Sequence, residues 1–197
     1  MNLEERTNRG TTLIPLESRI LTMRKILLTG EINFEMVDEV FRQLLMLEEQ
    51  DDPMPIQVSI DSCGGEVDAG FTLIDLFLGC KTPVQFYCLG RAYSMAAFLF
   101  ISGNHGRFML PNSKLMLHEP LIGQNYGGSA SDIKSLSEKL NSTKDRLIKL
   151  LTERTGREEE EIQKEINYDH FFTAEDAVEF GLCDKVVDFE QFREGQV

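Results

Sequence analysis

Strand-like stretches, glycines and apolar helix-like stretches alternate through the first half of this chain. Residues 56–60 alternate apolar and polar side chains, and a glycine pair separates them from an apolar stretch at residues 67–78. The same order returns where the β-forming residues 84–89 end at Gly90 and the apolar segment 94–101 follows. This alternation predicts an α/β domain, in which functional loops lie at the carboxyl ends of the strands.

The flanking regions fit the same fold class. Residues 24–32 predict a first strand and its turn, and Asn33 is placed to cap an amphipathic helix. Short strands are expected at residues 107–110 and 114–118. The apolar stripe of the helix after Asn33, expected to face the core, consists of Val37, Val40, Phe41, Leu44 and Leu47.

The character of the sequence changes after residue 120. A glycine-rich stretch at residues 121–131 leads into a long helix that we expect to end near Gly156. A helix so long, away from the strand pattern, predicts a projecting arm for self-association. A capping box at residues 173–176 begins a later helix. No linker divides the chain, so residues 1–197 are expected to form a single domain.

Composition and length restrict the class of protein. Hydrophobic residues make up 42% of the 197 residues, which is ordinary for a globular chain. The longest uncharged apolar run, Met95–Ile101, is far shorter than the about 20 residues of a membrane-spanning helix. Residues 1–10 carry charges of both signs and resemble neither a secretory signal nor a transit peptide. We therefore expect a cytoplasmic protein with no membrane partner.

Charge and residue spacing exclude further partners. The formal net charge of −13 would repel the phosphate backbone of a nucleic acid. The four cysteines form no Cys-x-x-Cys pair, and His105 and His170 lack the spacing of metal ligands. Neither common glycine-rich nucleotide motif is present. The sequence thus indicates reduced thiols, no metal, no cofactor and no nucleic acid partner.

Ser94 and His118 are candidates for chemistry, each with a plainer alternative. Ser94 begins an apolar segment, and if that segment is a helix, its first N–H groups point to the same space as the serine oxygen. An ordinary N-cap serine is the alternative, and the segment by itself favours it. His118 ends a predicted strand, where a general base can stand, although a histidine satisfied by backbone groups is more common. The pair Gly64-Gly65 either brings bare N–H groups close to a ligand or forms only a turn.

Four blocks of sequence occur in a fixed order: DSCGG at Asp61–Gly65, YSMAA at Tyr93–Ala97, LPNSKLMLHEP at Leu110–Pro120 and DHFFTAEDA at Asp169–Ala177. With these blocks the chain resembles ClpP, the proteolytic subunit of the Clp protease, in the ClpP/crotonase superfamily, from about residue 20 to 190. The resemblance implies an α/β spiral of β-β-α units with a projecting handle at about residues 121–156. It also implies an N-terminal axial segment at about residues 1–18.

The resemblance assigns roles to single residues. It implies that Ser94 is the nucleophile, His118 the general base and Asp169 the group that orients the imidazole. The N–H groups of Gly65 and Met95 are the implied oxyanion hole. The apolar segment behind the serine would then hold it still.

Substrate and assembly are also implied by the resemblance. The family binds an extended peptide between a strand at residues 65–68 and the segment 121–128. It stacks two heptameric rings through the handle helix, here about residues 131–154, and an AAA+ ATPase threads unfolded polypeptides into the chamber. We therefore expect a serine endopeptidase without a cofactor. The implied substrate-binding residues are Glu66, Val67, Leu121, Ile122 and Gly123.

Several positions depart from the family pattern, all of them outside the three candidate catalytic residues. Tyr168 replaces an arginine that pairs across the ring interface in the family. The cleft that docks apolar ATPase loops in the family has polar residues at the matching positions here. We hypothesise a divergent paralogue that docks an ATPase poorly alone and depends on a second kind of ClpP ring or on another partner. The other departures are Gln57, Ser59 and Gly79 in that cleft, and Cys63, Tyr93 and Glu119 beside the motifs.

Two alternatives stay open at this point. A weakly active or regulatory ring subunit is favoured by the departures and opposed by the intact set of three residues. A crotonase-type acyl-CoA enzyme shares the superfamily's spiral fold and oxyanion hole, but Ser94 and His118 in ClpP-like contexts oppose it.

Overall fold

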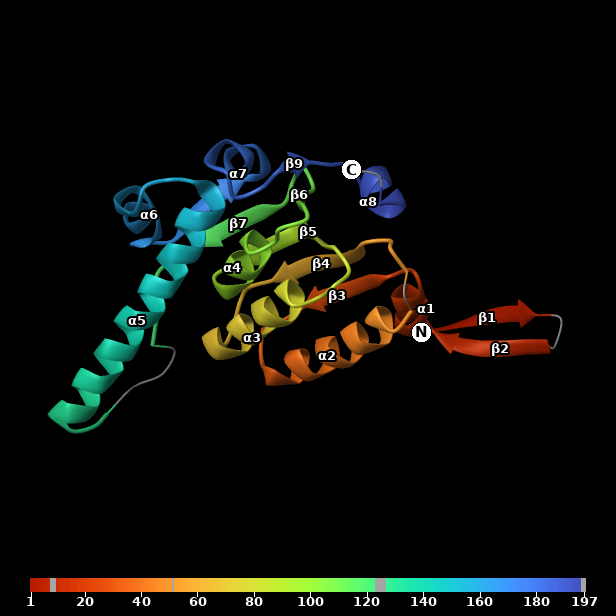
Figure 1. Cartoon of the computed structure of the whole chain (residues 1–197), viewed down its shortest axis with the longest axis horizontal. Helices are drawn as coiled ribbons and strands as arrows, with labels where there is room; N and C mark the ends of the chain where they lie inside the picture. Colours follow the sequence, from red (N-terminus) through yellow and green to blue (C-terminus); the bar gives the residue numbers. More distant parts are fainter. Residues whose placement is uncertain (8–9, 51, 123–126, 196–197) are drawn as a thin grey trace.

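A sheet of mostly parallel strands runs through the centre of the computed structural model, which describes residues 1–7, 10–50, 52–122 and 127–195 (Figure 1). Its strands are β3 (Lys25–Thr29), β4 (Ile56–Ser62), β5 (Val84–Tyr93), β6 (Arg107–Met109), β7 (Lys114–Leu117), β8 (His170–Thr173) and β9 (Lys185–Val186). They lie in the order β3-β4-β5-β6-β9, while β7 pairs with β5 and with the antiparallel β8. The predicted α/β fold class is confirmed.

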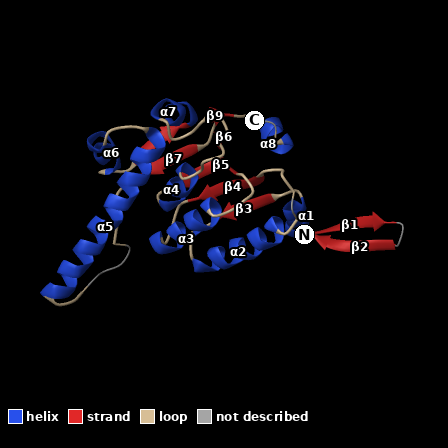
Figure 2. Ribbon diagram, in the orientation of Figure 1, coloured by secondary structure: helices blue, strands red, loops and turns tan. Residues whose placement is uncertain are grey.

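Helices α2 (Phe34–Glu48), α3 (Val67–Leu78) and α4 (Met95–Ile101) follow β3, β4 and β5 and bury their apolar side chains in one core with them (Figure 2). Asn33 caps α2 as predicted, because its side-chain oxygen accepts a hydrogen bond from the Met36 amide at 2.9 Å. All seven residues of α4 are buried, so this helix is surrounded by the core.

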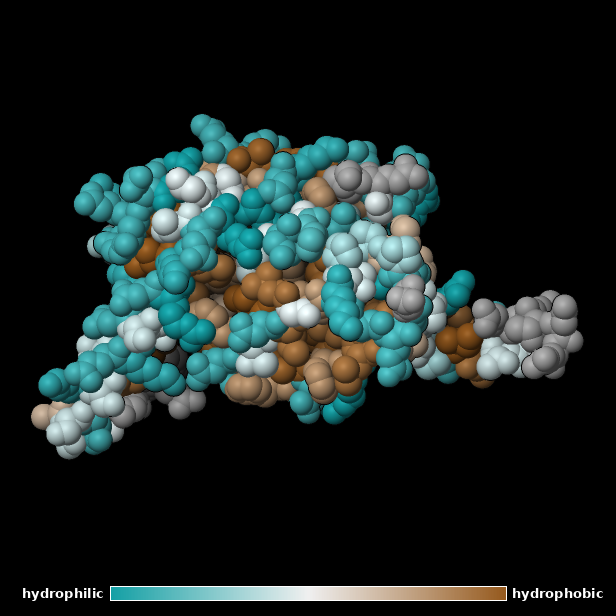
Figure 3. All heavy atoms as spheres, viewed as in Figure 1, coloured by the Kyte–Doolittle hydropathy of each residue, from teal (hydrophilic) through white to brown (hydrophobic). Residues whose placement is uncertain are grey.

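The expected core stripe of α2 is wrong at one position. Phe41 is 46% exposed, whereas the other four residues of the stripe are buried. Helical spacing places Phe41 on one face with Phe34 and Leu45, which are also exposed. Figure 3 shows apolar atoms gathered on the side of the molecule where α2, α3 and α4 lie. This apolar face is therefore not covered within a single chain.

Strand β5 is longer than the sequence predicts. It was expected to end at Gly90 but continues to Tyr93. Residues 86–88 pair with β6, and residues 91–93 pair with β7. Gly90 is thus an interior strand residue and no turn. The extra length matters for the site, because it brings β7 beside the end of β5.

The long helix is α5 (Ala130–Thr155), and it projects from the body as predicted (Figure 1). Ser129 and Asp132 form a capping box at its start, and Gly156 ends it with a left-handed backbone (φ 70°). Its buried residues, Leu147, Ile148 and Leu151, all lie in its C-terminal half. Helices α6 (Glu159–Ile166) and α7 (Ala174–Phe180) follow, and α7 begins at the predicted capping box.

Both ends of the chain carry elements that the sequence did not indicate. An antiparallel hairpin of β1 (Asn2–Thr7) and β2 (Gly10–Pro15) stands away from the body and leads into α1 (Leu16–Thr22) (Figure 1). At the other end, α8 (Phe189–Glu194) places Phe192 against the ring of Tyr87, with centroids 5.1 Å apart.

The positions expected to make the docking cleft polar, Gln57 and Ser59, contribute little exposed surface, although Gln57 lines a pocket of about 250 Å³ with several charged residues. Both residues are buried, at 6% and 3% exposure. The Gln57 amide donates to the Tyr87 hydroxyl at 3.3 Å, and Gly195 at the end of α8 lies against Gln57. The C-terminal residues therefore cover part of this surface, while Gly79 is exposed.

Candidate active site

Ser94 occupies the turn between β5 and α4 in a backbone conformation that normally requires glycine (φ 54°, ψ −129°). Its N–H donates to the Met116 carbonyl at 2.8 Å. Gly64 packs so closely on the turn that a Cβ there would lie 2.8 Å from the Ser94 Cβ. The surrounding structure thus holds a strained residue in place, which is typical of a functional position.

His118 follows β7 directly and faces the serine. The parallel register pairs Tyr93 of β5 with Met116 of β7, so both strands deliver their next residues to the same edge of the sheet. The His118 Nε2 atom lies 2.7 Å from the Ser94 Oγ atom. The two residues that the sequence singled out are therefore within hydrogen-bond distance.

Asp169 reaches His118 through the antiparallel pairing of β7 and β8. Leu117 pairs with His170, so His118 and Asp169 are the next residues beyond the ladder on the two strands. The Asp169 Oδ1 atom lies 3.3 Å from the His118 Nδ1 atom. The imidazole side chain is 17% exposed and the carboxylate 61%, so the carboxylate is the more solvent-exposed partner of this pair.

The Gly65 and Met95 amides border the serine without a described acceptor. A bridge between Ile32 and Gly65 uses the Gly64 carbonyl and the Glu66 amide, which leaves the Gly65 N–H unused among the described residues. Met95 is the first residue of α4, where an N–H has no partner within the helix. Both implied oxyanion-hole residues therefore lie beside Ser94 with their donors available.

A pocket of about 150 Å³ lies at this site and brings most of the sequence-predicted residues together. It is lined by Gly65, Val67, Ser94, Met95, Phe98, His118, Pro120, Leu121 and Leu147. A neighbouring pocket of about 300 Å³ shares Val67, Pro120 and Leu121 and adds Glu66 and Ile122. The two pockets therefore adjoin each other beside the serine, and together they are called the groove below.

The sequence interpretation of the groove needs one correction and misses three residues. The strand expected at residues 65–68 is wrong, because α3 begins at Val67 and only the isolated bridge at Gly65 and the extended Glu66 precede it. Gly123 lies outside the described residues. Phe98, Pro120 and Leu147 were missed as lining residues; Phe98 stands one helical turn after Ser94, which is a usable signal, whereas Leu147 comes from the distant α5.

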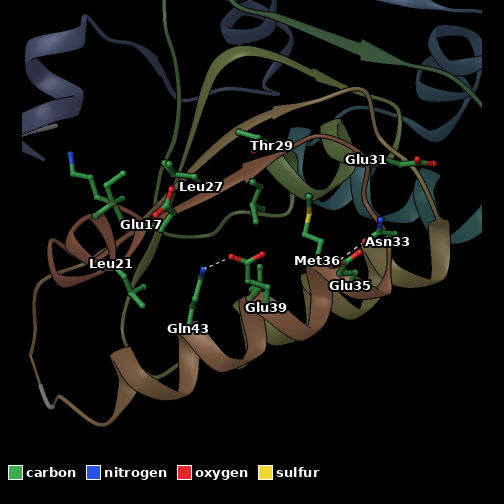
Figure 4. A pocket seen from close by; sticks show the side chains of 14 residues that line it. Glu17, Leu21, Leu27, Thr29, Glu31, Asn33, Glu35, Met36, Glu39 and Gln43 are labelled. Atoms are coloured by element: carbon green, nitrogen blue, oxygen red, sulfur yellow. Dashed lines mark hydrogen bonds between the residues drawn. The ribbon is translucent and has the colours of Figure 1, made fainter. Parts of the chain in front are cut away.

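A larger pocket, of about 510 Å³, lies between α1, β3 and α2 (Figure 4). Its titratable side chains are four glutamates and Lys25, and Gln43 donates to Glu39 at 3.1 Å within it. The fourteen residues that line it include no serine, cysteine or histidine. It therefore has no counterpart of the Ser94–His118 pair, and size alone does not make it the reaction site.

Hydrolases that work by acyl transfer use a hydroxyl, an imidazole and a carboxylate in series, with backbone amides beside the hydroxyl. The family model described as Clp protease matches residues 8–190 of this 197-residue chain. The chain therefore belongs to the Clp protease family, a family of hydrolases that cleave peptide bonds.

No helix in the described ranges combines the length and the apolar character that crossing a bilayer requires. Within the same ranges, no three His, Cys, Asp or Glu side chains gather in a way that suits a metal ion.

Proposed function

We propose that this protein is a serine endopeptidase that cleaves unfolded polypeptides, with Ser94 as nucleophile, His118 as general base and Asp169 as the orienting carboxylate. The observation that carries the proposal is the unbroken series of contacts from Ser94 Oγ to His118 Nε2 (2.7 Å) and from His118 Nδ1 to Asp169 (3.3 Å). Membership of the Clp protease family supports peptide bonds as the target.

The proposed reaction has two halves. In the first half, His118 takes the Ser94 hydroxyl proton as Oγ attacks the carbonyl carbon, and the N–H groups of Gly65 and Met95 receive the negative charge on the carbonyl oxygen. The C–N bond then breaks, and the imidazolium gives its proton to the departing amine. In the second half, water attacks the acyl-enzyme with the same base, which releases the acid and restores the hydroxyl.

The groove supports an extended peptide as substrate. Val67, Phe98 and Leu147 make the wall of the pocket beside Ser94 apolar, which favours an apolar side chain next to the cleaved bond. The groove continues past Glu66, Leu121 and Ile122, where backbone pairing would tolerate many sequences.

Assembly belongs to the same proposal. Members of this family usually form ring oligomers that work with AAA+ ATPases, and we infer heptameric rings for this chain. The exposed face of α2 that carries Phe34, Phe41 and Leu45 supports burial against a second copy, since large exposed apolar faces mark interfaces. The projecting half of α5 is available for ring stacking, and the β1–β2 hairpin for an axial position. A cytoplasmic location is part of this proposal.

A second candidate is a ring subunit that cleaves weakly unless it is paired with another ClpP paralogue. The observation in its favour is Tyr168, which is 85% exposed just before Asp169, where the resemblance implies an arginine that pairs across rings. Without that pair, a lone ring would hold Asp169 less firmly.

Cleavage of a short fluorogenic peptide with leucine before the scissile bond tests the proposal, with particle mass measured on the same sample. We expect hydrolysis that Ser94→Ala removes, in a particle of several subunits. Hydrolysis that appears only after mixing with a second ClpP ring supports the second candidate. Hydrolysis that survives Ser94→Ala would refute the assignment of the nucleophile.

A further inference from the structure

One lysine of α5 joins the chain on either side of the candidate site. Lys144 Nζ donates to the Glu119 carboxylate at 2.7 Å and to the side-chain oxygen of Asn167 at 3.4 Å. Glu119 directly follows the candidate base, and Asn167 stands two residues before the candidate carboxylate. A single ammonium group therefore contacts both segments that carry the His–Asp pair.

A backbone hydrogen bond closes the same connection. The Glu119 N–H donates to the Ile166 carbonyl at 2.7 Å. Ile166 is fully buried at the end of α6, so the core holds the accepting carbonyl group in place. The segments after His118 and before Asp169 are thus joined by one direct hydrogen bond and by two that pass through Lys144.

The sheet brings His118 and Asp169 together but does not include them in its ladder. The ladder of β7 and β8 ends at Leu117 and His170, and both candidate residues lie one position beyond it. The Asp169 carboxylate is 61% exposed, and its contact with the imidazole is 3.3 Å long. Contacts outside the ladder therefore contribute to the separation of the two side chains.

Lys144 is placed on a rigid support for that task. It stands on α5 just before Leu147 and Ile148, the first residues of the helix buried in the core. Its side chain is 26% exposed and that of Glu119 40% exposed, so the ion pair is partly shielded from water. Shielding makes such a pair stronger than the more exposed pairs elsewhere on α5.

We propose that Lys144 is a positioning residue that sets the His118–Asp169 distance through Glu119 and Asn167. The inference rests on the proposed function, since it concerns the same His–Asp pair. The sequence showed Glu119 only as a departure from the family pattern; the structure gives its negative charge a partner.

The test measures kcat and KM for the short peptide, together with the rate of Ser94 labelling by a fluorophosphonate. We expect Lys144→Met to lower kcat and the labelling rate about tenfold with KM changed less than about twofold, because misplacement below 1 Å already slows a reaction. Lys144→Arg should restore most of the loss. Lys149→Met is the matched control, because Lys149 lies on the same helix in an exposed pair with Glu153, and it should leave both rates unchanged.

A double-mutant cycle separates positioning from general structure. If Lys144 acts through the His–Asp pair, Lys144→Met should change the labelling rate by less than about twofold when Asp169→Asn is already present. If Lys144→Met fails to fold or assemble, Glu119→Gln carries the same cycle, with an expected loss of about threefold in the wild-type background only.

Two results would overturn the inference: full activity in Lys144→Met, or an equal loss with and without Asp169→Asn. Failure of the proposed function looks different. In that case the wild-type protein itself would show no cleavage or labelling that depends on Ser94.

Discussion

Ser94 Oγ and His118 Nε2 lie 2.7 Å apart, and this contact depends on the part of β5 that runs past Gly90. Only the last three residues of β5 pair with β7, and that pairing puts the ends of the two strands at the same edge of the sheet. The antiparallel pairing of β7 with β8 then adds Asp169. Three neighbouring strands therefore present the hydroxyl, the imidazole and the carboxylate in order.

The backbone strain at Ser94 predicts a difference between two inactive variants. Ser94→Ala and Ser94→Gly should both reduce cleavage by at least about 10³-fold, because neither has the hydroxyl. At φ 54° and ψ −129°, only glycine is unstrained, so Ser94→Gly should be more stable than Ser94→Ala by about 1 kcal/mol. Thermal unfolding at one protein concentration measures this. An alanine variant as stable as the glycine variant would show that the turn is not strained.

The Asp169 carboxylate is expected to matter for rate more than for binding. Asp169→Asn keeps the shape but removes the charge that favours imidazolium, so kcat should fall about 10²-fold or more with little change in KM. Steady-state kinetics on the short peptide give both values. A variant with wild-type kcat would mean that the 3.3 Å contact with His118 plays no part in the reaction.

Gly65 has no room for a side chain. Its φ is 154°, and a Cβ would lie 2.2 Å from the Ile32 carbonyl oxygen, so Gly65→Ala must displace the backbone that carries a proposed oxyanion donor. Loss of one such donor slows hydrolysis about 10² to 10³-fold. Gly79→Ala is the control, since Gly79 is exposed, has an ordinary helical backbone (φ −81°) and lies outside the groove. Kinetics and melting temperature should change for Gly65→Ala alone; equal behaviour of the two variants would contradict the assignment.

The four cysteines should differ in reactivity. Burial raises the pKa of Cys88 to about 12 and the pKa values of Cys80 and Cys183 to about 11, so these groups stay protonated thiols at pH 8. Cys63 is exposed. Brief treatment with iodoacetamide at pH 8 should therefore modify Cys63 first, and peptide mass spectrometry identifies the site. Rapid modification of Cys88 in the folded protein would show that this region opens.

Local features of this fold could be predicted because their causes lie within a few residues. The side chain of Asn33 caps α2, Gly156 ends α5 in a left-handed conformation, and Thr173 opens α7 with a capping box. Each is decided by a hydrogen bond or a backbone preference over one helical turn. The same reasoning failed for Phe41. Helical spacing predicts which residues of α2 share an apolar face, but it does not predict how much of that face is buried within a single chain.

Features that depend on distant partners could not be predicted from spacing. Gly90 resembled a turn because the sequence does not show that β7 pairs with the residues after it. The position of Asp169 beside His118 came only from resemblance, since it depends on the register of β7 and β8. The positive φ of Ser94 and the contact of Lys144 with Glu119 carried no sequence signal, because tertiary packing sets both.

The central claim is that His118 activates Ser94, and active-site labelling tests it most directly. Wild-type protein, Ser94→Ala and His118→Ala would be treated with a fluorophosphonate and digested, and the modified peptide would be identified by mass spectrometry. The account predicts one adduct, on Ser94, in the wild-type protein and none in either variant. An adduct on another serine, or labelling of Ser94 at the same rate without His118, would contradict it.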